Sequence, residues 1–152
     1  MKKSPQMKKL EETLRSSKLS LIGFLGDDTR DLTEILDADA REVALLGRTM
    51  EEIAQRMQEL TDAAKAELGA SCKLPDNLVV CADDNRGLIP CPWPHDVRCQ
   101  KTVTSVTRLD TAKSIRWSDL SIHLIRDHGF FQGKGSSFRL QPRELVELIF
   151  SE

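Results

Sequence analysis

Two cysteines and two histidines in the second half of the chain form the residue set best suited to chemistry. Seven residues separate Cys91 from Cys99, and four separate His123 from His128. Thiolate sulfur and imidazole nitrogen are the donors of structural zinc sites, which place four ligands in a tetrahedron. The pattern predicts a zinc site made of Cys91, Cys99, His123 and His128. The simpler alternative is that the cysteines are buried thiols that pack as small apolar residues.

The elements around these residues are a hairpin over residues 102–117 and a helix over 118–128. This order resembles, in part, the ββα zinc finger, in which the second histidine lies at or beyond the end of the helix. The spacing differs, because a finger separates its cysteines by two to four residues and places about twelve residues before the first histidine, whereas this chain has twenty-three. Cys72 and Cys81 offer an all-thiolate alternative with the other two cysteines, although the spacing matches no zinc ribbon.

The same region also contains the residue types of a nucleophilic enzyme. A thiol next to an imidazole base is a common activated nucleophile. If the protein is an enzyme, we expect Cys91, His95, His123 and His128 to carry the reaction. The linear order does not show a base, an orienting group and an oxyanion hole together, so this interpretation is the alternative.

A glycine-rich loop further along the chain has the composition of an anion site. Glycine, lysine and hydroxyl groups can form a nest of backbone N–H groups around an oxyanion. The candidate residues are Gly133, Lys134, Gly135, Ser136 and Arg139. The loop is not a phosphate-binding P-loop, because the early glycine of that motif is missing. A flexible turn between a helix and a short extended segment is the alternative.

The segment from Gly47 to Met57 resembles the opening helix of many bacterial helix-turn-helix DNA-binding modules. The turn expected after Met57 is absent, since Gln58-Glu59-Leu60 continues the helical pattern. The following residues, 61–68, are net acidic, which disfavours contact with a phosphate backbone. A capping box formed by Thr49 and Glu52 explains the similarity better.

Apolar periodicity predicts an α+β fold. Residues 1–69 form a helical segment with helices at about 5–17, 29–46 and 50–68, the last two joined as a helical hairpin. The remainder, residues 70–152, forms a small domain with an antiparallel β-sheet, a Pro-rich Cys loop, a β-hairpin and two C-terminal helices.

The charge is unevenly distributed along the chain. Residues 98–143 contain nine basic residues and three acids, a net charge of +6, which leaves −8 for the rest because the chain total is −2. We expect this segment to face the acidic helical half, or else to bind nucleic acid or another anion. No apolar run approaches the ~20 residues of a membrane span. We expect no membrane association, a cytoplasmic location and reduced cysteines.

Together these patterns predict a small, bacterial-type, non-catalytic binding or assembly module, with zinc as an optional structural cofactor. A small enzyme using a Cys91/His pair is the first alternative. A nucleic-acid or anion-binding module based on residues 98–143 is the second. A homo-oligomer formed through the N-terminal helices is the expected assembly, and the sequence identifies no small-molecule ligand.

Overall fold

The computed structural model describes residues 4–16 and 23–150, and it confirms the predicted α+β class. Its helices are α1 (Pro5–Ser16), α2 (Leu32–Leu45), α3 (Met50–Ala66), α4 (Asp119–His128) and α5 (Pro142–Ile149). Its strands are β1 (Cys72–Leu74), β2 (Leu78–Asp83), β3 (Leu88–Pro90), β4 (Arg98–Gln100), β5 (Val103–Arg108) and β6 (Lys113–Ser118). The expected helix over 5–17 ends at Ser16, and residue 17 lies outside the described residues.

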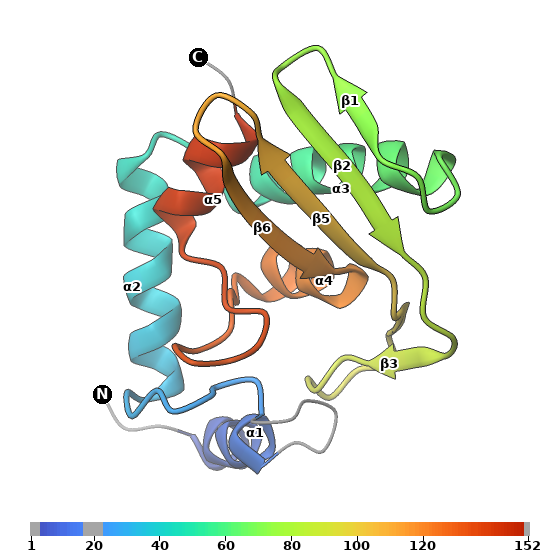
Figure 1. Cartoon of the computed structure of the whole chain (residues 1–152). Helices are drawn as coiled ribbons and strands as arrows, with labels where there is room; N and C mark the ends of the chain where they lie inside the picture. Colours follow the sequence, from blue (N-terminus) through green and yellow to red (C-terminus); the bar gives the residue numbers. More distant parts are fainter. Residues whose placement is uncertain (1–3, 17–22, 151–152) are drawn as a thin grey trace.

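Four strands form an antiparallel sheet in the order β1-β2-β5-β6 (Figure 1). The hairpin predicted over residues 102–117 is β5 and β6, in which Val106 lies opposite Ile115. Side chains alternate between the faces of a strand. Val80, Val106 and Trp117 are therefore buried on one face of the sheet, together with residues of α3 and α4.

Helix α3 covers the buried face of the sheet because its apolar residues recur every three or four positions. Ile53, Met57, Leu60 and Ala64 are fully buried, as the periodicity predicts. The Thr49 hydroxyl accepts a hydrogen bond from the Glu52 backbone N–H, and the Glu52 carboxylate accepts one from the Thr49 N–H. The predicted capping box is therefore present.

Helices α2 and α3 are joined by a short turn, but each packs mainly against other elements rather than against the other. The chain turns sharply at Gly47 between α2 and α3, as expected, but α2 packs mainly against α5 while α3 packs against α4 and the sheet (Figure 1). Helix α2 begins at Leu32 rather than near residue 29. Asp28 does not cap it, because the Asp28 carboxylate instead accepts hydrogen bonds from Arg30 and from the Lys134 backbone N–H.

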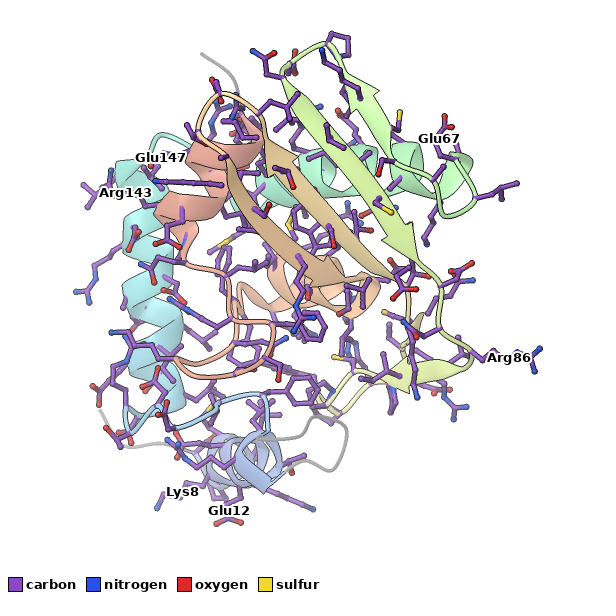
Figure 2. All side chains as sticks on the ribbon, in the orientation of Figure 1. Lys8, Glu12, Glu67, Arg86, Arg143 and Glu147 are labelled. Carbon is purple, nitrogen blue, oxygen red and sulfur yellow. The ribbon has the colours of Figure 1, made fainter. Side chains whose placement is uncertain are left out.

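A second, smaller apolar cluster lies below the sheet. It joins α1 and α2 to α4 and to the β3–β4 hairpin, and its buried members are Leu14, Phe24, Leu25, Leu32, Ile35, Cys91, Leu120, Leu124 and Phe130. Both clusters contain residues from the two halves predicted from sequence, so residues 1–69 and 70–152 share their cores. Figure 2 shows charged side chains such as Lys8, Glu12 and Arg86 projecting outward around these cores.

No helix among the described residues combines the length and the apolar character needed to cross a bilayer.

Candidate metal centre

The tip of the β3–β4 hairpin supplies two of the candidate ligands. The Cys91 backbone N–H donates to the Val97 carbonyl at 2.8 Å, which continues the strand pairing by one residue beyond β3. Proline at positions 90, 92 and 94 restricts the backbone of this tip. The His95 N–H then donates to the Trp93 carbonyl at 2.7 Å, a tight turn that brings His95 back toward Cys91.

Helix α4 supplies the other two ligands. Ser118 caps its start by accepting a hydrogen bond from the Ser121 N–H, and Gly129 ends it in the left-handed conformation at φ +61°. Leu120 and Leu124 bury one side of α4 in the smaller cluster, beneath the hairpin. His123 and His128, both half-buried, are thereby presented to the hairpin tip.

Cys91, His95, His123 and His128 meet at one point. Each offers one ligand atom, and all four atoms lie within 4.8 Å of one another. The His95 Nε2 lies 3.3 Å from the His123 Nε2 and 3.2 Å from the His128 Nε2. The Cys91 Sγ lies 3.5 Å from the His128 Nε2.

The three shortest of these separations match edges of a zinc tetrahedron. Usual zinc bond lengths place two nitrogen ligands about 3.3–3.4 Å apart and a nitrogen and a sulfur about 3.5–3.6 Å apart. Hydrogen bonds can pair these four atoms only two at a time, because each Nε2 carries at most one proton. A cation at their centre would contact all four lone pairs at once.

Neighbouring side chains orient the ligands. The Asp127 Oδ2 lies 3.3 Å from the His123 Nδ1, so a proton on Nδ1 leaves the Nε2 lone pair directed toward the other ligands. The Trp93 ring stacks on His128 with ring centres 4.1 Å apart and planes inclined by 10°. The indole therefore fixes the imidazole plane and shields that side of the cluster from water.

The titration behaviour of the ligands reflects their burial. Burial, together with the neighbouring His123 and His95, lowers the pKa of His128 to about 4. Burial also lowers the pKa of His123. Both rings are therefore neutral at pH 7, which is the form that binds metals. Burial raises the pKa of Cys91 to about 11, so its thiolate requires a nearby cation.

The four-residue group differs from the predicted zinc set in one ligand. His95 is a member and Cys99 is not. Cys99 lies on β4 opposite Ile89, half-buried beside the smaller cluster, and burial raises its pKa. The sequence signal for His95 was its spacing from Cys91: three intervening residues, within the range that separates paired ligands in zinc fingers.

The other two cysteines lie on the sheet, away from this group. Cys72 is on β1 and Cys81 on β2, and the Cys81 thiol contacts the Gly69 carbonyl at 3.4 Å. The structure therefore does not bring the four cysteines together as an all-thiolate group, and each is a free thiol.

The glycine-rich loop binds carboxylates of its own chain. The Lys134 backbone N–H donates to the Asp28 Oδ2 at 3.1 Å. The Arg139 guanidinium forms two hydrogen bonds with the buried Asp39 carboxylate, at 2.6 and 3.0 Å. Gly133 lies so close to the Leu25 backbone, and Gly135 so close to the Asp27 side chain, that a Cβ at either glycine would clash. These donors of the predicted anion loop therefore already have partners inside the molecule.

The basic segment is partly neutralised by the helical half. Arg139 pairs with Asp39 of α2, and Arg126 lies 3.7 Å from Glu51 of α3. These contacts favour an internal structural role for part of the positive charge.

Helix α3 runs without a break through the position where a helix-turn-helix would turn, and its apolar face is buried.

The arrangement can thus hold one metal ion between a proline-restricted hairpin tip and the last turns of a helix. A thiolate and three imidazoles suit zinc better than magnesium or calcium, which prefer oxygen ligands.

Comparison of the chain with protein-family models, with curated proteins and with solved structures found no match.

Proposed function

We propose that Cys91, His95, His123 and His128 bind one zinc ion with a structural role in a small, non-catalytic binding or assembly module. The observation that carries the proposal is the convergence of four ligand atoms within 4.8 Å of one another, with three of their separations at 3.2–3.5 Å. The ion would fasten the hairpin tip to the end of α4. The short strands β3 and β4, with three residues each, have little pairing of their own.

The ligand number supports a structural role. Structural zinc sites take all four ligands from the protein, whereas catalytic sites keep one position open for water or substrate. Here the protein offers four ligands. His95 is the only exposed member, so the ion would be covered on its other sides by protein.

The enzyme alternative uses the same four residues, and their geometry distinguishes the two functions. A nucleophilic cysteine requires an accessible thiol with a lowered pKa. The Cys91 side chain is only 6% exposed, and burial raises its pKa to about 11. This environment suits a thiolate formed on a metal ion better than one that attacks a substrate.

The proposal is tested by measuring metal content and ligand identity together. The full chain is purified without a metal-affinity step and its zinc content is determined by mass spectrometry. Cobalt is then exchanged into the site, since tetrahedral Co²⁺ bound to a thiolate has intense visible and near-ultraviolet absorption. We expect about one zinc per chain and a cobalt spectrum typical of one thiolate and three imidazoles.

Four variants identify the ligands. We expect Cys91→Ser, His95→Ala and His123→Ala to lose most of the bound metal. Cys99→Ser is the matched control, because its thiol lies on the same hairpin but outside the group. It should retain zinc and the cobalt spectrum. A zinc-free protein that binds no added zinc would overturn the proposal, and so would a metal that depends on Cys99 but not on His95.

A further inference from the structure

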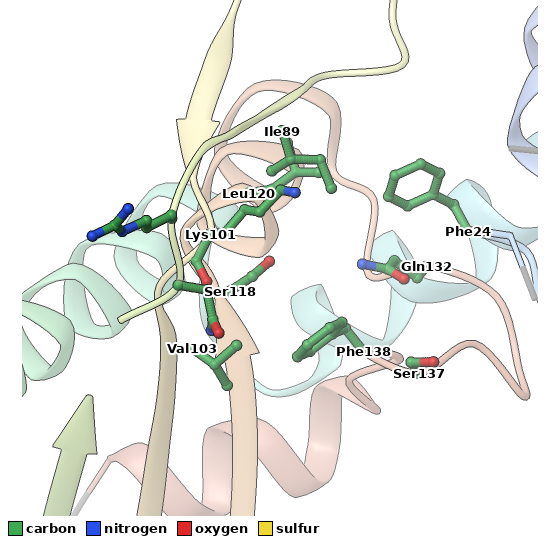
Figure 3. Close-up of a pocket in the computed structure, with 11 residues that line it drawn as sticks. Phe24, Ile89, Lys101, Val103, Ser118, Leu120, Gln132, Ser137 and Phe138 are labelled. Atoms are coloured by element: carbon green, nitrogen blue, oxygen red, sulfur yellow. The ribbon is translucent and has the colours of Figure 1, made fainter. Parts of the chain in front are cut away.

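A cavity of about 540 Å³ lies between the glycine-rich loop, the start of α4 and the segment that enters β3. Figure 3 shows its lining residues arranged around a central space. Ile89, Leu120 and Val103 form one side, and Phe24 and Phe138 form the other. The volume falls in the range of about 300–1,000 Å³ found for small-molecule sites.

Gln132 places a hydrogen-bond donor in this apolar wall. Gln132 is 3% exposed, and its side-chain amide oxygen Oε1 accepts a hydrogen bond from the Ser136 hydroxyl. That bond turns the amide nitrogen toward the cavity (Figure 3). Within residues 4–16 and 23–150, no protein acceptor is found for this Nε2. Because this nitrogen faces the cavity, a ligand acceptor placed there would gain a hydrogen bond.

The charge of the cavity has one sign. Lys101 and Arg86 are its charged lining residues, and no lining residue is a carboxylate. The Lys101 side chain runs across the opening toward Ile89 and Leu120 (Figure 3), whereas Arg86 extends outward from the molecule (Figure 2). Neither forms an ion pair with any described residue. A lysine over an apolar cavity favours a negatively charged group at the opening.

We propose that this cavity binds a small organic oxyanion, an aromatic or branched apolar body that carries one carboxylate or sulfonate group. The apolar body would lie between Phe24, Phe138 and the aliphatic side. The oxyanion would accept hydrogen bonds from the Gln132 amide and the Lys101 ammonium. Two donors suit a single oxyanion with two accessible oxygens better than a polyphosphate, which requires more cationic groups.

Backbone geometry supports a built site. Gln132 has φ +68°, a left-handed conformation that residues other than glycine rarely adopt. Its backbone carbonyl oxygen accepts a hydrogen bond from the Arg139 guanidinium at 2.8 Å, and the same guanidinium is hydrogen-bonded to Asp39. These contacts fix the position of the amide before any ligand arrives, and this preorganisation lowers the entropic cost of binding.

The cavity and the metal centre are separate sites that share two elements. Ile89 precedes Cys91 by two residues on the hairpin, and Leu120 lies on the same helix as His123. No metal ligand lines the cavity. The two proposals therefore have different readouts, metal content for one and binding of an organic anion for the other.

The test compares charged and neutral probes of similar shape. Phenylpropionate, the neutral phenylpropanol and anilinonaphthalene sulfonate are titrated into the full chain by calorimetry and by ¹H–¹⁵N spectra. We expect saturable one-to-one binding of the two anions and much weaker binding of the alcohol. The shifted amides should belong to the cavity, at residues 85–89, 101–103, 118–120 and 132–138.

Substitutions assign the two donors. Lys101→Gln changes an exposed side chain and should weaken anion binding about three- to tenfold without altering the fold. Gln132→Glu, which adds a negative charge, should weaken it further. Lys113→Gln, a similarly exposed lysine that does not line this cavity, is the control and should bind normally.

The outcomes separate clearly. If neither anion binds saturably to the folded protein, the cavity is not such a site. If the alcohol binds as tightly as the acid and Lys101→Gln has no effect, oxyanion recognition is excluded. Binding of the sulfonate but not of the carboxylate, with loss in Lys101→Gln, would support the site and narrow the ligand class.

Discussion

The larger apolar cluster, between the sheet and α3, and the smaller cluster, beneath the β3–β4 hairpin, differ in the groups that border them. Among the described residues the larger has nineteen buried apolar members and the smaller has nine. The larger is bordered by paired strands of six residues. The smaller is bordered by two strands of three residues, by the Cys91/His group and by the buried carboxylate of Asp28.

This difference separates two ways of stabilising a fold. Burial of apolar surface contributes about 25 cal/mol per Å², so packing contributes more to the stability of the larger cluster. The smaller cluster buries fewer side chains. The hairpin tip above it therefore depends more on specific polar contacts, and on a bound ion if the proposed zinc is present. We therefore expect a substitution in the larger cluster to lower the stability of the whole fold, and loss of a bound ion to act locally on the hairpin.

The largest expected effect comes from the centre of the larger cluster. Trp117 is fully buried, and its indole N–H donates to the Thr61 hydroxyl at 2.9 Å. Trp117→Ala should lower the free energy of unfolding by about 3–5 kcal/mol, because it leaves a cavity and a hydroxyl without its partner. Urea unfolding followed by circular dichroism measures the loss.

The control for this prediction is Leu45→Ala, since Leu45 is 82% exposed. It should change the stability by less than about 0.5 kcal/mol. The folded fraction of Trp117→Ala should keep whatever zinc affinity the natural chain has, because the proposed ligands lie outside this cluster. A Trp117→Ala variant as stable as the natural chain would contradict the packing argument.

Removal of metal should act locally. If zinc is present at about 1,000 times its dissociation constant, chelation removes about 4 kcal/mol of stabilisation from the state that binds it. Amide hydrogen exchange before and after chelation should show faster exchange in β3, β4 and the last turn of α4. Exchange in β2 and β5 should change little. Equal acceleration in both regions would remove the distinction between the two clusters.

The sequence predicted the regions where the determinants are local. The β5–β6 hairpin follows from alternating residues, and the α3 start from a capping box between Thr49 and Glu52. Gly129 marked the end of α4. In each case residues close in the chain determine the geometry, so a short window carries the signal.

The sites depend on residues that are distant in the sequence, which is why they were only partly predicted. Cys91, His123 and His128 were named, but His95 was assigned only to the enzyme alternative, because its position depends on how the proline-restricted tip folds over α4. Gln132 was not singled out at all. Its place in the proposed ligand site depends on its positive φ and on its hydrogen bond to Ser136, and neither has a signal in the residue order.

A smaller effect is expected at the carboxylate beside the proposed metal ligand His123. Asp127→Asn weakens the acceptor for the His123 Nδ1 proton without removing a ligand. Loss of such an orienting group typically lowers metal affinity about 10- to 100-fold. Competition with a chromophoric chelator measures the change. Asp110→Asn, at an exposed aspartate near Arg108, is the control and should keep the affinity of the natural chain.

The smallest effect concerns Asp28, which fastens the smaller cluster without metal. Its carboxylate accepts hydrogen bonds from the Arg30 side chain and backbone and from the Lys134 N–H. The Arg30 guanidinium holds the pKa of Asp28 well below its ordinary value of 3.8. The folded state therefore binds this proton less readily than the unfolded state. The resulting stabilisation is fully present above about pH 4 and is lost as the pH falls through the folded pKa.

Asp28→Asn should lower stability by about 1–2 kcal/mol at pH 7, because the amide has one acceptor oxygen and no charge. The difference from the natural chain should shrink as the pH falls below about 4, because Asp28 becomes protonated in the unfolded chain while the folded carboxylate stays ionised. Urea unfolding at several pH values, on protein treated with chelator, measures this without interference from the metal ligands. A difference that stays constant down to pH 2 would show that the ion pair with Arg30 contributes nothing, and the smaller cluster would then depend on packing and metal alone.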